Sequence, residues 1–549
     1  MRVWISVIAA AASVLAASGA AMAGPPAGTG SYEDFVALFL EFETWGQDDP
    51  LIDRDGGGIA VADYSDAAVA ARIETVDDYL GQMADMNVAA WDRARQAEYL
   101  AVRARIDQHN FWLRASRPFE RDPGFYVDPL LWLTFTELPA EGEALARLRA
   151  RLAAVPALLE AARTNLDAAA ADYADLALHN LTTADGVGHG HPYRETPPAG
   201  VIGWYEDLLA RAEAEQPALV PDIEAALAAV RAFRDWLEAN RPDMTAAAGV
   251  GEARFDWYLE HVKLMPWTAS EIVALGEREL DRMSAFHALE RHRNRDLPEL
   301  EPAASAEEYR RRIAETDARV RRFLEDEDII TIPDHIGALD HNVPWIVRPG
   351  GWNFWEEVQY RDPTPDHLHA VIPGHRFDGR MVVDHPVRGR IGDGARIEGW
   401  ATYLEEAMLQ AGLLDDRPRT RELIYIFGIF RAARVPADVW LQTNEMTVDE
   451  AVAYWRSVTP YLDADVARVD AEIYLRRPPG YGLGYQVGAM QMQGLLADRR
   501  RQLGDAFSLR AFHDSFLARG RLPISLIRWE MTGLDDEVRE FWDREPIPE

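Results

Sequence analysis

The sequence has no cysteine, fewer basic than acidic residues and, beyond its first residues, no long apolar run. The absence of cysteine excludes disulfides, thiolate metal ligands and cysteine nucleophiles. With 57 Lys+Arg against 91 Asp+Glu, the net charge of −34 opposes the phosphate contacts of a nucleic-acid binder. A membrane-spanning helix needs about 18 uninterrupted apolar residues, and no later segment has such a run. We therefore expect neither a nucleic-acid partner nor a membrane span, and any metal must be held by His and carboxylates.

The first 23 residues have the pattern of a cleavable secretory signal. Arg2 precedes an apolar run rich in Ala, Val and Ile, and Ala21-Met22-Ala23 then forms an A-x-A cleavage site. We expect cleavage after Ala23, which leaves a mature chain of residues 24–549. The protein is then exported, and periplasmic if its host has two membranes.

Apolar residues recur at three- and four-residue spacing through most of the chain, which predicts a mainly α fold. A helix is expected to begin with Thr268 or Ser270 as its cap, because acidic Glu271 follows in the first turn. The segment 182–200 is rich in Gly, Pro and His and is expected to be a loop. Its His189 and His191 are possible metal ligands, although such a pair is more often incidental.

Residues 331–365 differ from the helical blocks on either side, because they are dense in Pro, Gly and aromatic residues. We expect a few short strands near 330–360 and loops that form the wall of a central cleft. No linker separates independent units, so we expect a single helical domain over 24–549. Its N-terminal helical half spans about 24–250 and its second half about 251–549.

A group of His beside acidic residues indicates a metal site in the second half. Four of the 14 His lie between positions 367 and 385, and Glu398 follows in a segment with a helical pattern. Two His and one carboxylate are a common ligand set of catalytic zinc. His369 and His375 are six residues apart, which in a regular helix places them about 240° apart. Pro373-Gly374 lies between them and permits a kink that brings the imidazoles together.

His369-Ala-Val-Ile-Pro-Gly-His375 resembles the H-E-x-x-P-G-H motif of the bacterial family known as domain of unknown function 885. Glu398-Gly-Trp-Ala-x-Tyr403 is similar to that family's E-G-W-A-x-Y segment, and two further similar blocks are 251–280 and 507–523. The family is largely helical and looks like a distant relation of zinc metallopeptidases of the thimet-oligopeptidase and Taq-carboxypeptidase type. The resemblance implies one zinc ion held by His369, His375 and Glu398. It also implies that Tyr485 and His513 donate hydrogen bonds to a developing oxyanion.

One position departs from the family motif: Ala370 stands where the family has its Glu, the general base. Loss of that base lowers the rate of hydrolysis by roughly 10²–10⁴-fold unless another acid replaces it. The acids nearest in sequence are Asp366, Asp378, Asp384, Glu356 and Glu357. Glu405, two helical turns after Glu398, is a candidate to orient a ligand imidazole or a solvated surface acid. His367 and His385 are alternative ligands.

Three functions follow from these residues. The first is a zinc-dependent, metallopeptidase-like hydrolase of short peptides. The second is a peptidase scaffold that has lost turnover and binds a peptide or small ligand. The third is a metal-dependent hydrolase of a non-peptide amide or ester. The sequence leaves the oligomeric state open.

Overall fold

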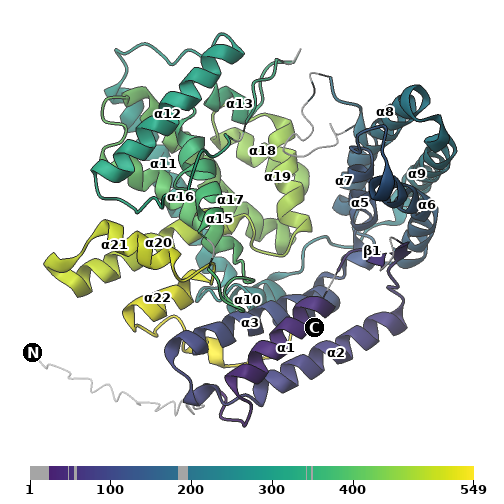
Figure 1. Ribbon diagram of the computed structural model, residues 1–549, viewed down its shortest axis with the longest axis horizontal. Helices are drawn as coiled ribbons and strands as arrows, with labels where there is room; N and C mark the ends of the chain where they lie inside the picture. Colours follow the sequence, from purple (N-terminus) through teal and green to yellow (C-terminus); the bar gives the residue numbers. More distant parts are fainter. Residues whose placement is uncertain are drawn as a thin grey trace, which may run out of the picture.

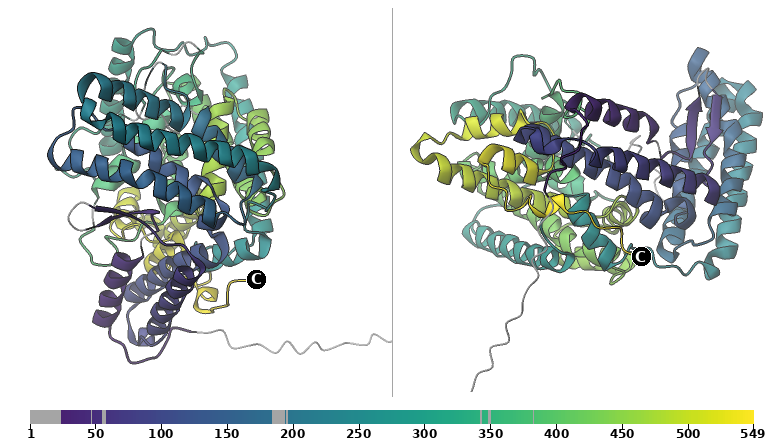
Figure 2. Two further views of the ribbon diagram at one scale, coloured as in Figure 1. Left: turned by 90° about the vertical axis from the view of Figure 1, so that its right-hand side faces the viewer. Right: turned by 90° about the horizontal axis from the view of Figure 1, so that it is seen from below.

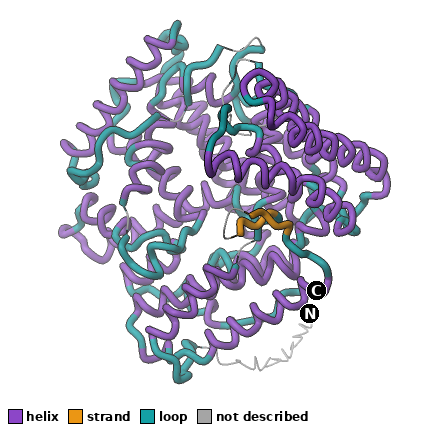
Figure 3. Tube along the Cα trace, turned by 45° about the vertical axis from the view of Figure 1, so that its right-hand side comes forward, coloured by secondary structure: helices purple, strands orange, loops and turns teal. Residues whose placement is uncertain are grey.

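The computed structural model describes residues 24–46, 48–54, 58–183, 194, 196–341, 343–347, 350–381 and 383–549. Within these residues the fold is mainly helical, as predicted, and Figure 3 shows a short orange hairpin among purple helices. In the hairpin, β1 (Leu51–Arg54) pairs with β2 (Gly58–Val61) antiparallel, with Leu51 opposite Val61. Figure 2 shows the two arrows against the helices that include α6, which β2 contacts.

The N-terminal helices form two groups in Figure 1, one at the bottom and one at the right. The bottom group is α1 (Tyr32–Trp45), α2 (Asp66–Ala84) and α3 (Arg93–Phe111). The short α4 (Pro118–Arg121) leads into the second group, which consists of α5 (Gly124–Leu133), α6 (Gly142–Asn165), α7 (Ala171–Thr182), α8 (Gly200–Glu215) and α9 (Val220–Asn240).

The remaining helices begin at residue 252, shortly after the expected boundary between the two halves. They are α10 (Glu252–His261), α11 (Ala269–Arg293), α12 (Ala306–Asp326), α13 (Phe354–Gln359), α14 (Thr364–Asp366), α15 (His375–Arg380), α16 (Gly394–Ala411), α17 (Pro418–Gln442), α18 (Val448–Val458), α19 (Ala464–Arg476), α20 (Leu483–Leu503), α21 (Leu509–Leu517) and α22 (Ile524–Thr532). The expected helix start at Thr268 is confirmed, because the Thr268 side chain accepts a hydrogen bond from the Glu271 amide and the Glu271 side chain bonds back to the Thr268 amide.

The helix α17 lies at the centre of the second half and is buried along nearly its whole length. It packs along α11 and against α20, and α20 in turn packs along α16. The helices α16 and α20 approach closely at Gly399 and Gly488. A Cβ on Gly399 would lie 2.5 Å from the Gly488 backbone, so only glycine fits there. This contact fixes the position of Glu398, the residue before Gly399.

The strands expected near 330–360 are absent from the described part of that segment, so this prediction is wrong. The segment is instead a loop followed by α13, and aromatic side chains hold it in place. The Tyr360 hydroxyl donates to the Pro344 carbonyl and accepts from the Ile346 amide, at 2.8 Å each. Trp345 packs on Tyr360 with ring centroids 4.5 Å apart. A side chain thus satisfies two backbone polar groups of the loop that a neighbouring strand would otherwise have to pair.

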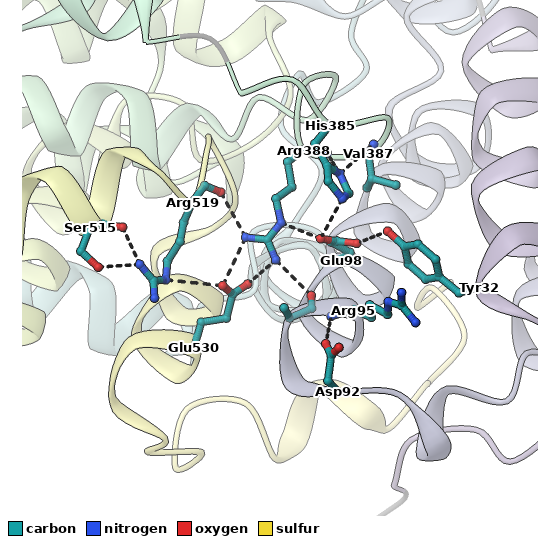
Figure 4. Close-up of polar contacts among 11 residues, drawn as sticks. Tyr32, Asp92, Arg95, Glu98, His385, Val387, Arg388, Ser515, Arg519 and Glu530 are labelled. Atoms are coloured by element: carbon teal, nitrogen blue, oxygen red, sulfur yellow. Dashed lines mark hydrogen bonds and ion pairs between the residues drawn. The ribbon is translucent and has the colours of Figure 1, made fainter. Parts of the chain in front are cut away.

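A buried network of charges joins the N-terminal helices to the loop before α16 and to the C-terminal helices (Figure 4). Glu98 on α3 accepts a hydrogen bond from Tyr32 on α1 at 2.5 Å and from the Arg388 guanidinium at 2.6 Å. Arg388 also contacts Glu530 on α22 at 2.7 Å, and Arg519 lies 3.5 Å from the other Glu530 oxygen. Segments far apart in the sequence are thus held together around the same carboxylates.

Two expectations concern residues outside those described. The signal segment 1–23 lies outside them, and so do His189 and His191 of the loop between α7 and α8. Among the helices that the structure describes, none combines the length and the apolar character that crossing a membrane requires.

Candidate metal centre

The chain bends sharply between His369 and His375, as the Pro373-Gly374 pair predicts. His369 lies in a π-helical turn, His367–Val371, and His375 is the first residue of α15. A Cβ on Gly374 would lie 1.8 Å from the His369 carbonyl oxygen, so only glycine fits at position 374. The bend brings the two Nε2 atoms to 3.1 Å from each other, with the rings at 84°.

Glu398 reaches the two imidazoles from α16. The Asp393 side chain caps this helix by accepting the Arg396 amide hydrogen at 2.7 Å. The Trp400 indole donates to the Pro373 carbonyl at 3.0 Å and so ties α16 to the bend between the two His. Glu398 Oε2 lies 3.1 Å from His375 Nε2 and 3.5 Å from His369 Nε2.

The three ligand atoms match the spacing of a tetrahedral zinc site. Zinc bonds of about 2.0–2.2 Å to nitrogen and oxygen place neighbouring ligands about 3.3–3.6 Å apart. The observed separations of 3.1, 3.1 and 3.5 Å are close to this range. Within the described residues, His369, His375 and Glu398 form the one group of His and acidic side chains close enough to share an ion. His375 has the most exposed side chain of the three, at 29%, so the open side of the group is at His375.

Glu405 lies behind His369, two turns along α16 from Glu398. Its Oε1 is 2.9 Å from His369 Nδ1, and its Oε2 contacts the Arg431 guanidinium. A carboxylate at Nδ1 favours the tautomer with the proton on Nδ1 and leaves the Nε2 lone pair free for a metal. Glu405 and Arg431 are both buried. The surface-acid interpretation of Glu405 is therefore wrong.

Charges within the group shift its ionisation. Burial disfavours the charged form of Glu398, but contacts with His369 and His375 hold its pKa well below the ordinary value. Burial and the nearby Arg431 act to lower the pKa of His369, yet Glu398 and Glu405 raise it above the ordinary value. Both shifts have the same cause, because a buried carboxylate and a buried imidazole stabilise each other's charge. The site accommodates a positive charge between these side chains.

Two tyrosines at the start of α20 adjoin the group. The Tyr485 ring is stacked beside His369, with centroids 6.2 Å apart and planes at 10°. Burial raises the pKa of Tyr485 well above its ordinary value, and the nearby charge of Glu398 adds to this shift. The Tyr485 hydroxyl therefore stays protonated. The Tyr481 hydroxyl donates to Glu398 Oε1 at 3.3 Å. Tyr481 was not predicted; it lies in the turn just before α20, four residues before Tyr485.

His513 lies elsewhere, and the structure does not bring it to the His-His-Glu group. Tyr403 contacts its Nε2 at 2.9 Å, and the Ile329 carbonyl lies 2.8 Å from its Nδ1. Both ring nitrogens are therefore occupied, and the side chain is fully buried. Tyr403 is five residues after Glu398, so the two side chains point to opposed faces of α16. His513 links α21 to the far face of that helix.

The two alternative ligands are also engaged away from the group. His367 Nε2 lies 3.1 Å from Asp317, and His385 accepts the Val387 and Arg388 amide hydrogens at 3.3 Å. The structure therefore brings together His369, His375, Glu398 and Tyr485 of the predicted residues.

None of the five acids proposed as replacements for the motif Glu is placed against the group's open side by a described contact. Asp378 pairs with Arg396 and Arg521, Glu357 contacts Arg361, and Glu356 caps α13. Asp384 is exposed. Asp366 is buried, and its charged neighbours are first His369 and then Arg431 and Glu405.

The fold and the site define a mainly helical protein with a His-His-Glu group of metal-site geometry. The chain belongs to a bacterial family described as "Bacterial protein of unknown function (DUF885)", whose profile matches residues 57–331 and 366–531. The predicted resemblance to this family is confirmed. Comparison with curated proteins gives no match.

Two solved structures have the same fold. One is described as a candidate lipoprotein of unknown function from Shewanella oneidensis, with a TM-score of 0.70 and 16% identity over 92% of this chain and 100% of that one. The other is described as a candidate lipoprotein from Colwellia psychrerythraea, with a TM-score of 0.67 and 15% identity over 90% of this chain and 98% of that one. At such low identity the likeness concerns the fold alone.

Proposed function

We propose that the protein is an exported, zinc-dependent hydrolase of short peptides that binds one zinc ion through His369, His375 and Glu398. The observation that carries the proposal is the triangle of His369 Nε2, His375 Nε2 and Glu398 Oε2, with sides of 3.1, 3.1 and 3.5 Å. Export is supported by the signal pattern of residues 1–23 and by the description of two proteins of the same fold as candidate lipoproteins. When bound, zinc supplies Lewis acidity and an open position for water or a carbonyl oxygen.

The protein's own side chains prepare the reacting groups. Glu405 holds the His369 ring through Nδ1, and Tyr481 holds Glu398 through Oε1, so that Nε2 and Oε2 face each other. Tyr485 keeps its proton at neutral pH and donates a hydrogen bond to the substrate oxygen that gains negative charge. These residues position and stabilise, but none of them is placed as the general base.

A second function is favoured by a specific observation, the methyl side chain of Ala370. Ala370 is 7% exposed and stands where the family motif has the acid that takes a proton from water. A chain without that acid retains a metal site and a peptide-binding surface but turns over slowly. In this alternative the protein binds a peptide or small ligand on a peptidase scaffold. A hydrolase of non-peptide amides or esters is the third candidate.

Metal content tests the first proposal. We expect about one zinc per chain in the purified mature protein by mass spectrometry, because three protein ligands are the usual catalytic set. His375→Ala removes one ligand and is expected to abolish that zinc. His292→Ala is the matched control, because His292 is exposed near the end of α11 and should keep full zinc. Equal zinc in all three proteins, or none in wild type after zinc is supplied, contradicts the proposed site.

The substitution Ala370→Glu separates the hydrolase from the binding protein. Restoring the acid is expected to raise the rate of peptide cleavage by roughly 10²–10⁴-fold if the base is what the chain lacks. Ala370→Gln has nearly the same shape without a carboxylate and should give no gain. A large gain with Glu alone favours a disarmed peptidase, whereas efficient cleavage by wild type favours an active enzyme with another base. Ester and amide panels run on wild type identify the third candidate.

A further inference from the structure

A polar pocket of about 380 Å³ lies between α3, α10 and the first residues of α16. Its four charged lining residues are Arg105, Lys263, Arg390 and Asp393, so three of the four are basic. The chain as a whole carries a net charge of −34, and a local excess of positive charge therefore stands out against its surroundings. In such a molecule an anionic ligand is repelled from most of the surface and attracted to this pocket.

The basic groups of the pocket are only partly neutralised by protein. Arg105 pairs with Glu43 at 3.3 Å and is 46% exposed. Arg390 is exposed, and Lys263 is half-buried with its charge near the buried carboxyls of Asp393 and Asp438. Asp393 also accepts the Arg396 amide hydrogen at 2.7 Å at the start of α16. Arg390 is thus open to a ligand, and Lys263 lines the pocket while it also offsets the charge of these two carboxyls.

Lys263 is the single lysine of the sequence, in which the other Lys+Arg residues are all arginines. Its ammonium is a compact charge with three donors, suited to one oxygen atom, whereas a guanidinium is a planar fork. The stem of Lys263 lies against the loop before α20: a Cβ on Gly480 would be 3.3 Å from Lys263 Cε. The next residue of that loop is Tyr481, whose hydroxyl donates to Glu398.

The pocket and the His-His-Glu group share one face of α16. Gly394 lines the pocket, and Glu398 follows it by four residues, one turn further along the same side of the helix. One turn advances about 5.4 Å along the axis.

We propose that the pocket lined by Lys263 and Arg390 binds the C-terminal carboxylate of a short peptide, whose chain then runs toward His369, His375 and Glu398. This inference rests on the proposed function for the identity of the ligand as a peptide. It adds a substrate class, peptides with a free C-terminus. Amidated or long, internally bound peptides are poor ligands.

The single lysine provides a direct test on the wild-type protein. Amine acylation of Lys263 is followed by peptide mass spectrometry with N-acetyl-trialanine and with its C-terminal amide, which differ only in the anion. The free acid is expected to slow acylation at least several-fold and the amide to have no effect. Equal protection by both peptides, no protection by either, or equal protection by inorganic phosphate at the same concentration overturns the proposal.

Substitutions give an independent readout by calorimetry. Lys263→Met and Arg390→Met are each expected to weaken binding of the free acid about tenfold, because each removes a charged hydrogen-bond donor. Lys263→Arg should retain most of the affinity, and Arg322→Met, at an exposed position of α12, should change nothing. Unchanged affinity in both Met variants overturns the proposal.

The acylation experiment is repeated on zinc-stripped protein, which separates this inference from the proposed function. Protection there with no zinc site in wild type would leave the carboxylate pocket standing and remove the hydrolase. A zinc site without protection would remove the pocket alone.

Discussion

At position 370 this chain has Ala where the H-E-x-x-P-G-H motif that it resembles has Glu. The side chains around Ala370 nevertheless have the arrangement of a metal site. The contact of Glu405 with His369 Nδ1 at 2.9 Å is the clearest sign of that arrangement. The same carboxylate also pairs with Arg431 of α17, and its contact with Nδ1 is suited to presenting the His369 imidazole to a metal. The effect of this contact can be measured directly.

Glu405→Gln is expected to weaken zinc affinity about 10- to 100-fold, because the carboxylate no longer favours the proton on His369 Nδ1. Competition with a chelating dye measures the change. Glu277→Gln, at an exposed position of α11, is the control for loss of one negative charge. Equal affinity in the two variants would show that Glu405 serves Arg431 and the fold alone.

Tyr485→Phe is expected to reduce peptide hydrolysis about 10²–10³-fold and to leave zinc content unchanged, because it removes an oxyanion donor and no ligand. Rates are compared in wild type and in Ala370→Glu, where the signal is larger. Loss of zinc together with activity would instead assign Tyr485 to holding the His369 ring.

At the scale of elements, the site depends on how closely α16 and α20 approach. Glu398 and Glu405 belong to the first helix, Tyr481 precedes the second and Tyr485 lies within it, so their separation follows from the crossing of the two helices. That crossing is made of small residues, including Gly399, Gly488 and Ala395. The glycine of the E-G-W-A motif is thus explained by packing against Gly488.

Gly488→Ala is expected to lower the free energy of unfolding by about 1–3 kcal/mol, since its Cβ would lie 2.3 Å from the Ala395 carbonyl oxygen. Gly494→Ala, two turns later on the exposed side of α20 with no atom within 4 Å, is expected to raise it by about 0.5–1 kcal/mol. Chemical denaturation measures both. The same sign for both variants would contradict close packing at the crossing.

At the scale of the whole molecule, stability depends on imidazoles that are buried in their neutral form. Burial lowers the pKa of His513 from 6.5 to about 4, and it lowers that of His261 and His341 to about 4 as well. Between these pH values the unfolded chain binds protons that the folded chain excludes. The contribution of these neutral imidazoles to the free energy of unfolding is therefore complete above pH 6.5 and is lost as the pH falls toward 4.

The contribution of His513 to this loss is expected to be up to about 3 kcal/mol. His513→Gln removes the titration, so its free energy of unfolding should fall less steeply than that of wild type between pH 6.5 and 4. His292→Gln changes an exposed imidazole and should follow wild type. Parallel curves for wild type and His513→Gln would contradict the assignment.

The sequence by itself determined the features that arise from local patterns. Apolar spacing gave the mainly helical fold, the Thr268 and Glu271 pair gave the start of α11, and Pro373-Gly374 gave the bend between the two His. Each depends on interactions within a few residues, which the sequence displays directly. The His cluster and the helical segment after it also indicated Glu398 as the carboxylate of a metal site. The family resemblance added Tyr485, which belongs to a separate helix and could not have been placed beside His369 by local reasoning.

Only the tertiary structure decided the features that depend on long-range packing. In the segment 331–360, the Tyr360 hydroxyl bonds the Pro344 carbonyl and the Ile346 amide and so supports a loop. No pattern within the segment predicts that contact. His513 is excluded from the site because α16 turns Tyr403 away from Glu398, and Tyr481 enters it because α20 crosses α16 at two glycines. Likewise, the basic pocket exists because Lys263 and Arg390, more than a hundred residues apart, meet beside Gly394. Such contacts are set by the directions in which packed helices point their side chains, and that information is spread over the whole chain.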